Sequence, residues 1–262
     1  MSEGKSVPES APNPHDIHRV IREEGEEQLS RHLGAVAWSG LGAGLSMGFS
    51  FLTMALLQAR LPIDAPWRPL VSSFGYTLGF LIVILGRQQL FTETTLTPVL
   101  PLLSNFSVAR LGQLFRFWAV VLVANLAGTW LFALAIAHEN FFAPPVWRAL
   151  ESIADEAVLA PFAPMIVHAI LAGWIIALMV WLLPSAGSAK TLIIFVLTYV
   201  VAMAQFSHVI AGSCEAAFAV LTGSHTLGEY FTVFLGPTLL GNTIGGVALV
   251  ALLNHAPLAT ER

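Results

Sequence analysis

The sequence predicts an all-α integral membrane protein with six transmembrane helices. The composition is the first reason: 56% of the 262 residues are hydrophobic and only 11% are charged, whereas a soluble domain carries about 25% charged residues. The second reason is a series of uncharged runs long enough to cross a bilayer, which takes about 20 residues of helix. The third is that 11 of the charged residues precede Leu33, so the remainder is strongly apolar.

The polar N-terminal region divides into two parts. Residues 1–14 are rich in Pro and Ser, a composition typical of disorder. Residues 15–31 have an acidic face together with the apolar Ile17, Val20 and Ile21, which predicts a cytoplasmic amphipathic helix. Because no apolar stretch of a signal peptide precedes Leu33, we expect the N-terminus to remain in the cytoplasm.

The membrane domain is expected to cover residues 33–253. Four uncharged runs are continuous, and we interpret them as spans one, three, four and six: Leu33 to Ala59, Phe117 to Ala137, Ala157 to Ala189 and Tyr230 to Leu253. Two further runs contain polar residues in the middle, between Arg87 and Glu93 and between Gln205 and Ser213. We interpret these as interrupted second and fifth spans. Residues 254–262 form a short tail.

The distribution of Lys and Arg predicts the orientation, because cytoplasmic segments carry an excess of them. With six spans and the N-terminus inside, the outer loops hold three of these residues: Arg60, Arg68 and Arg148. The cytoplasmic segments then hold eight: Lys5, Arg19, Arg22, Arg31, Arg110, Arg116, Lys190 and Arg262. Both termini are therefore expected in the cytoplasm.

An internal repeat relates the two halves of the membrane domain. Asn125 and Gly128 in span three recur as Asn242 and Gly245 in span six, at an offset of 117 residues. The same offset carries Phe91 onto His208 and the first break onto the second. Three spans per half is an odd number, so the halves must be inverted relative to each other, and paired interrupted helices point to a transport site. The repeats are residues 33–138 and 157–253.

Polar groups at the two breaks are costly at membrane depth unless they line a cavity or are paired. Arg87 and Glu93 are expected either to form a structural ion pair or to contact a substrate. Thr92 or Thr94 can cap the half-helix that follows, and the positive ends of both half-helices would favour an anion. His208 lies in the second break, where we expect a functional role.

Several other function classes are excluded by residue content. The net charge is −4 and there is no basic cluster, so nucleic-acid binding is not expected. The single cysteine, Cys214, excludes a disulfide framework and a Cys-based zinc site, and we expect neither metal nor cofactor. No His-Glu-x-x-His motif occurs and no two Asp residues are paired at membrane depth, so the chain is not expected to be an enzyme. We assign His168 to structure, and Glu215 to compensation of a helix dipole.

The motifs at the breaks resemble those of the formate/nitrite transporter family over nearly the whole chain, from span one to span six. The family's Leu-Phe-Thr motif occurs as Leu90-Phe91-Thr92, and its Phe-x-His motif as Phe206-Ser207-His208. Its paired Asn-x-x-Gly motifs begin at Asn125 and Asn242. The longer string from Gly86 to Glu93 is most similar to the YfdC-like branch.

This resemblance implies an aquaporin-like fold, a homopentamer with one pore per protomer in a bacterial inner membrane, and passage of small monovalent anions or their weak acids. Thr92 and His208 would face each other in a chamber between two apolar constrictions, one of them at Tyr76 and the other at Val201. The implied substrate pathway is Thr92, His208, Tyr76, Phe80, Leu90, Phe91, Val201 and Phe206.

The sequence departs from the family pattern at three positions. Gln89 replaces a usual acidic residue, Gly173 stands where an asparagine is expected, and Glu93 is additional. Two alternatives therefore remain beside an anion or weak-acid channel: a pore for small neutral solutes, and a membrane scaffold that conducts nothing. If transport occurs, we expect His208 to set its pH response, because an unperturbed histidine titrates near neutral pH.

Overall fold

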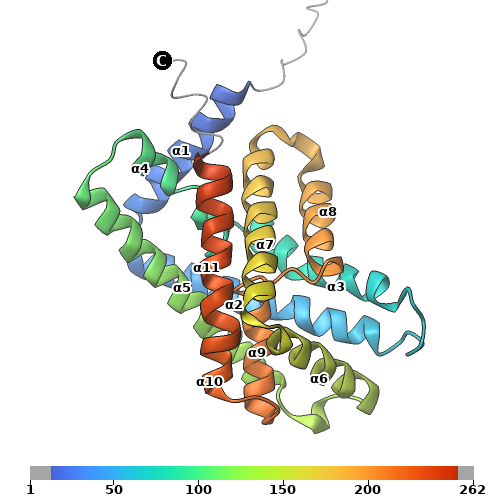
Figure 1. Ribbon diagram of the computed structural model, residues 1–262. Helices are drawn as coiled ribbons and strands as arrows, with labels where there is room; N and C mark the ends of the chain where they lie inside the picture. Colours follow the sequence, from blue (N-terminus) through green and yellow to red (C-terminus); the bar gives the residue numbers. More distant parts are fainter. Residues whose placement is uncertain (1–12, 253–262) are drawn as a thin grey trace, which may run out of the picture.

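The structure of the protein is a computed structural model that describes residues 13–252. Every regular element in this range is helical, which confirms the all-α prediction. Disorder was predicted for residues 1–14: residues 1–12 lie outside the described residues, as does the tail predicted at 254–262, whereas Asn13 caps a helix that begins at Pro14, so the predicted boundary was wrong there. In Figure 1, α1 and α4 lie near one end of the molecule, and α6 and α10 lie near the other.

Helix α1 (Pro14–Ser30) corresponds to the predicted amphipathic segment. Its first turn is capped by Asn13, whose side chain accepts a hydrogen bond from the Asp16 amide at 2.9 Å. Ile21 on its apolar face is fully buried. At Gly25 the helix approaches the chain that follows the first break so closely that a Cβ would overlap the Thr97 carbonyl oxygen. The helix is therefore docked on the membrane domain along its whole buried face.

Polar contacts complete this docking. Thr97 Oγ1 donates to Gln28 Oε1 at 2.7 Å, and the Arg110 guanidinium donates to Glu26 at 2.8 Å. Glu24 keeps an exposed surface, but partial desolvation raises the pKa of its carboxyl, while the positive charge of Arg87 acts in the opposite direction. The docked helix thus holds a proton on Glu24 more tightly than the free helix would.

We expect α1 docking to weaken as the pH rises. A carboxyl whose pKa is raised in the docked state favours docking at acid pH, and this contribution is lost as the pH passes upward through the raised pKa. Glu24→Gln should therefore increase the hydrogen-exchange protection of α1 at pH 7.5 by about two- to fivefold and flatten its pH dependence. The control is Glu23→Gln, an exposed residue that contacts Arg19 on the same helix. Equal protection of wild-type α1 at pH 5 and 7.5 would contradict the prediction.

Within residues 13–252, five helical segments are long and apolar enough to cross a membrane. Four are α2 (Leu33–Gln58), α3 (Arg68–Leu85), α5 (Val108–Ile136) and α7 (Phe162–Leu182). The fifth is a continuous helix with two π-helical stretches, formed by α10 (Leu227–Glu229), η5 (Tyr230–Leu235), α11 (Gly236–Ile244) and η6 (Gly245–Leu252). Two shorter apolar helices, α8 (Lys190–Met203) and α9 (Ala211–Thr222), follow each other in the chain.

Short elements connect these helices. They are η1 (Glu93–Thr95), α4 (Val99–Ser104), η2 (Glu139–Phe141), α6 (Pro144–Leu159), η3 (Leu183–Ser185) and η4 (Gly187–Ala189). The fourth run, predicted to begin at Ala157, was placed too early, since α6 occupies its first residues and α7 starts after Pro161. Proline cannot continue a helix that precedes it, because it has no amide hydrogen and its ring clashes with the previous turn.

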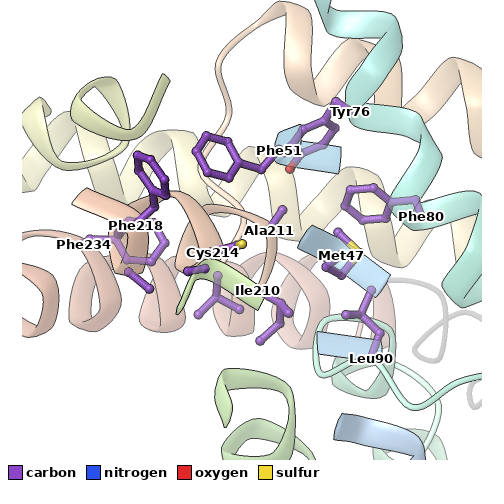
Figure 2. Packing of buried hydrophobic residues seen from close by; sticks show 14 of the residues in the cluster. Met47, Phe51, Tyr76, Phe80, Leu90, Ile210, Ala211, Cys214, Phe218 and Phe234 are labelled. Carbon is purple, nitrogen blue, oxygen red and sulfur yellow. The ribbon is translucent and has the colours of Figure 1, made fainter. Parts of the chain in front are cut away.

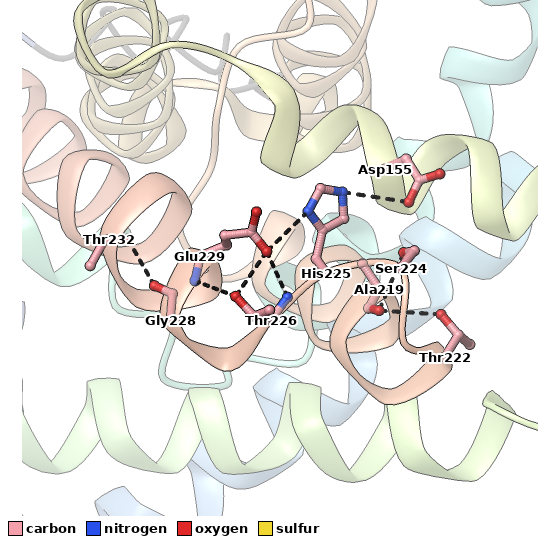
Figure 3. A network of polar contacts seen from close by, with 9 residues as sticks. All are labelled: Asp155, Ala219, Thr222, Ser224, His225, Thr226, Gly228, Glu229 and Thr232. Carbon is pink, nitrogen blue, oxygen red and sulfur yellow. Dashed lines mark hydrogen bonds and ion pairs between the residues drawn. The ribbon is translucent and has the colours of Figure 1, made fainter.

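The turn between α9 and α10 connects to α6 through charged side chains, as Figure 3 shows. α9 ends at Gly223, whose φ of 86° is the left-handed conformation that glycine adopts without strain. Thr226 and Glu229 then form a capping box at the start of α10. His225 lies between two carboxylates, 3.6 Å from Asp155 on α6 and 3.7 Å from Glu229. These contacts fix the far end of α9.

The two halves of the chain repeat the same contacts between helices. α2 packs on α3 and α5 in the first half, and α7 packs on α8 and α11 in the second; Figure 1 shows α7 and α11 side by side. A Cβ at Gly44 of α2 would overlap the Asn125 carbonyl oxygen, and a Cβ at Gly173 of α7 would overlap that of Asn242. The asparagine expected at Gly173 therefore cannot fit there, because the backbone of α11 occupies its place.

The two breaks are also related by the repeat, but their separation in the sequence is one residue greater than the separation between the two motif asparagines. Arg87 and Gln205 both have positive φ, 50° and 52°, which is uncommon for residues other than glycine. Each follows a helix end with the same backbone hydrogen bonds, and each is followed by an extended segment. The position equivalent to His208 is therefore Leu90. The expected equivalence of His208 with Phe91 was wrong, because the loops and the following helices do not share one offset.

Candidate functional site

Thr92 and His208 meet where the two non-helical segments approach each other. Thr92 Oγ1 lies 2.7 Å from His208 Nε2, and their side chains are 0% and 1% exposed. The two residues are 116 positions apart in the sequence. The chain around them is not helical from Gln88 to Leu90 or from Phe206 to His208, so several of its backbone groups need partners outside a helix.

Two fully buried asparagines supply those partners. Asn125 of α5 accepts from the Phe91 amide and donates to the Gln89 carbonyl, both at 2.8 Å. Asn242 of α11 does the same in the second half. It accepts from the Val209 amide at 2.8 Å and donates to the Ser207 carbonyl at 2.9 Å. The motif asparagines therefore hold the two segments in their non-helical conformation.

Each asparagine also connects its segment to a further helix. The second amide hydrogen of Asn125 reaches the Gly40 carbonyl of α2 at 2.8 Å, and that of Asn242 reaches the Ala169 carbonyl of α7 at 2.7 Å. One side chain thus joins three parts of the chain in each half. From the sequence these residues marked only a repeat, and their role in holding the backbone becomes visible only in the structure.

The hydrogen bonds of His208 determine its tautomer. Nδ1 accepts from the amides of Ile210 at 3.3 Å and Ala211 at 3.1 Å. A nitrogen that accepts two such bonds carries no proton, so the ring proton is assigned to Nε2, which donates to Thr92 Oγ1. The imidazole therefore acts as the cap of α9 on one side and as a donor on the other.

The free amides expected at the start of α9 are all occupied. Val209 donates to Asn242, Ile210 and Ala211 donate to the His208 ring, and the Gly212 amide donates to the His208 carbonyl at 2.9 Å. These four amides therefore cannot donate to a ligand, although the dipole of the helix still acts on it.

The threonines after the first break do not cap the next helix as we expected. Thr92 makes no capping bond at η1, because its hydroxyl contacts His208. Thr94 donates instead to the Phe91 carbonyl at 2.7 Å. The Thr92 hydroxyl is consequently available for a contact across the two halves.

A cavity of about 760 Å³ extends from the end of the molecule that carries α6 to the His208 side chain. Four of the predicted pathway residues line it: Tyr76, Val201, Phe206 and His208. Tyr76, Val201 and His208 are almost fully buried, at 6%, 0% and 1% exposure, and Phe206 is half-buried. The cavity therefore reaches side chains in the interior of the protein, His208 among them.

The other four predicted pathway residues do not reach this cavity wall in the part of the chain that the structure describes. Thr92 contacts His208, and the Phe80 ring stands edge-on to the imidazole at 5.0 Å between centroids. Leu90 is fully buried, and Figure 2 shows it near Met47 and Phe80. Phe91 packs against Trp118 of α5 at 6.0 Å. Apolar side chains thus close the space beyond His208.

The expected ion pair between Arg87 and Glu93 is not formed. Arg87 is exposed and Glu93 is half-buried, and no ion pair joins them among the contacts of residues 13–252. The Oε1 atom of Glu93 is buried without a hydrogen-bond partner. The left-handed backbone at Arg87 turns the chain there, so a six-residue separation does not bring the two side chains together.

Sequence reasoning missed most polar residues of the cavity. Arg68 of α3, Glu156 of α6 and Glu215 of α9 line it, and so does His168 of α7, which we had assigned to structure. Gln205 donates to Glu156 at 3.2 Å across the cavity wall. The only sequence signal for these residues was their charge next to apolar runs. The sequence does not show which helices face the cavity, because that depends on how α6 packs on α9.

Comparison with known proteins identifies the family. The sequence model of the formate/nitrite transporter family matches residues 15–256. This chain belongs to the formate/nitrite transporter family. It is 38% identical to the inner membrane protein YfdC of Escherichia coli K12, over 94% of this chain and 79% of that protein. It is 25% identical to the formate channel FocA of the same strain, over 92% and 95% of the two chains. As a family member, it is a multi-pass membrane transport protein and not an enzyme.

Solved structures confirm the fold of this family member. A pentameric formate channel with formate bound superposes with a TM-score of 0.74 at 19% identity, over 87% of this chain and 98% of that one. A second channel of the family gives a TM-score of 0.71 at 22% identity, over 93% and 96% of the two chains. The resemblance stated from the sequence motifs is thus confirmed for family and fold.

Proposed function

We propose that the protein is a channel of the bacterial inner membrane for small monovalent weak acids, such as formic or nitrous acid, and their anions. The observation that carries this proposal is the buried Thr92–His208 contact at the closed end of the cavity. The names of its relatives, a formate channel and an inner membrane protein, support the substrate class and the location.

Six spans are part of this proposal. α8 and α9 together would cross the membrane once, as a fifth span interrupted between Met203 and Ala211. α3, η1 and α4 would form the second span, interrupted after Leu85. The matching left-handed residues and the matching asparagine contacts support treating the two segments alike. The two halves would then be inverted relative to each other.

The orientation and assembly are further parts of the proposal. The Lys and Arg distribution supports a cytoplasmic position for α1, and the cavity would then open to the outer side. A homopentamer with one pore per protomer is proposed from the fold shared with a pentameric channel. Apolar side chains on the outer faces of the helices, such as Trp38, Val123 and Leu134, are exposed in the single chain and would contact lipid or neighbouring protomers.

The chemistry of the site follows from the assigned hydrogen bonds. Thr92 Oγ1 accepts from His208, so its own hydroxyl hydrogen can donate to an oxygen of the solute. Desolvating an anion among Phe80 and Leu90 is costly unless it gains hydrogen bonds or crosses as the neutral acid. A proton on Nδ1 would face two amide hydrogens, so charging the ring requires the cap of α9 to open. This argues against our expectation that simple titration of His208 sets the pH response.

Uptake of labelled formate into proteoliposomes tests the proposal and its two alternatives. With the vesicle interior more alkaline than the medium, we expect protein-dependent uptake that follows the gradient. The reversed gradient, with the interior more acidic, is the control. Permeation of water or ammonia without formate would favour the pore for neutral solutes. Vesicles that contain correctly assembled protein and pass none of these solutes would favour the non-conducting scaffold, and the proposed function would then fail.

A further inference from the structure

Three charged side chains line the cavity: Arg68, Glu156 and Glu215. They differ in depth, because Arg68 begins α3 and Glu156 lies near the end of α6, whereas Glu215 lies on α9 close to His208. The cavity would therefore present different charges to a solute at its mouth and at its closed end.

The two charges at the mouth offset each other. The Arg68 guanidinium is half-buried and is held by two hydrogen bonds to the Gln58 carbonyl, at 3.2 and 3.1 Å. Its positive charge lowers the pKa of Glu156, against a larger upward effect of desolvation. Glu156 also accepts a hydrogen bond from Gln205. The mouth thus contains one cation and one carboxyl group that act on each other.

Glu215 has no such partner. Its side chain is half-buried, and among residues 13–252 its carboxyl accepts no hydrogen bond and forms no ion pair. Its Oε2 atom lies 3.8 Å from the position that a Cβ on Gly212 would occupy. Gly212 is one helical turn after His208, so the carboxyl points back along α9 towards the imidazole. It therefore lies on the wall of the closed end.

Among residues 13–252, no cationic side chain forms an ion pair with this carboxyl. The other titratable groups on the cavity wall are Arg68 and Tyr76 from α3, Glu156 from α6, His168 from α7, and His208. His208 is neutral in its assigned tautomer, and the first amides of α9 are already bonded within the protein. An anion that approaches Thr92 from the cavity must therefore pass an unpaired carboxyl group.

We propose that Glu215 determines the charge selectivity of this cavity: when ionised, it holds anions away from His208, so the pathway admits an uncharged weak acid in preference to its anion. The inference rests on the proposed function and specifies which form of the solute crosses. The proton of the crossing acid stays on the solute, so no covalent step is involved. Removing the charge should admit the anion.

The test compares anion and acid flux of formate in proteoliposomes that contain the full-length protein. At pH 8.5 formate is almost wholly ionised, so electrical current reports the anion; at pH 5 the internal acidification reports the undissociated acid. Glu215→Gln should raise the anion-to-acid flux ratio at least about tenfold, which corresponds to roughly 1.4 kcal/mol. Glu215→Ala, which removes both the charge and the volume, should change the ratio in the same direction.

The matched control is Glu139→Gln, which removes an exposed carboxylate near the α6 end of the molecule, outside this cavity. It should leave the ratio at the wild-type value. Formate flux with an unchanged ratio in both Glu215 variants would overturn this inference alone. A wild-type protein that moves formate in neither form would overturn the proposed function, and this inference with it.

Discussion

Asn242→Ala is expected to unfold the second non-helical segment and to abolish transport. The side chain is fully buried and is the hydrogen-bond partner of the Val209 amide and the Ser207 carbonyl. Alanine leaves both backbone groups buried without these partners, at a cost of about 1–3 kcal/mol each. A loss of roughly 2–6 kcal/mol is a large part of the typical stability of a folded protein.

Thermal unfolding of the detergent-solubilised oligomer measures this effect, and formate uptake measures its consequence. The control is Asn105→Ala, because Asn105 is an exposed asparagine at the end of α4. It should change the melting temperature by no more than a few degrees. A variant at Asn242 as stable as the Asn105 control would show that other contacts hold the segment.

Thr92→Val is expected to lower formate flux roughly ten- to hundredfold, the range that corresponds to one lost hydrogen bond in a buried site. Valine has nearly the same shape as threonine but lacks the hydroxyl. The variant therefore leaves His208 Nε2 without its 2.7 Å partner and removes the donor that we assign to the solute. Because His208 still caps α9, the protein should fold and assemble.

Two variants separate this effect from a general change in packing. Thr92→Ser keeps the hydroxyl and should retain flux within about threefold. Thr129→Val makes the same chemical change at another fully buried threonine, whose hydroxyl bonds only to the Leu126 carbonyl on its own helix. Wild-type flux in Thr92→Val, measured by uptake into proteoliposomes, would remove Thr92 from the pathway.

The elements of the fold were predictable because each depends on local properties of the sequence. Run lengths and charges located α2 and α3 closely. The predicted third span began at Phe117, well after α5 begins at Val108, and the predicted fourth run extended beyond both ends of α7. The polar residues around Arg87 and Gln205 marked the places where α3 and α8 end. The Thr92–His208 contact was expected only through the resemblance to a family, since no local pattern joins two residues 116 positions apart.

The predictions that failed concern how the chain and its side chains are oriented in three dimensions. The Arg87–Glu93 pair was inferred from closeness in sequence, but a positive φ at Arg87 alters the course of the chain. Glu215 was assigned to a helix dipole because it lies at the start of the second half-helix, and nothing in the neighbouring sequence indicates that α9 also borders a cavity shared with α6. The one-residue error in the repeat arose because the motif asparagines and the breaks follow different offsets.

The equivalence of Leu90 and His208 would make the proposed conduction pathway chemically asymmetric along its length. The same backbone arrangement carries an apolar side chain in one half and an imidazole in the other, and only the imidazole borders the large cavity. A solute arriving from the cavity meets its polar partner before the apolar barrier, whereas a solute arriving from the α1 side meets them in the opposite order. We therefore expect the two directions of flow to have different access resistances, and a blocker too wide for the barrier to act from the cavity side only.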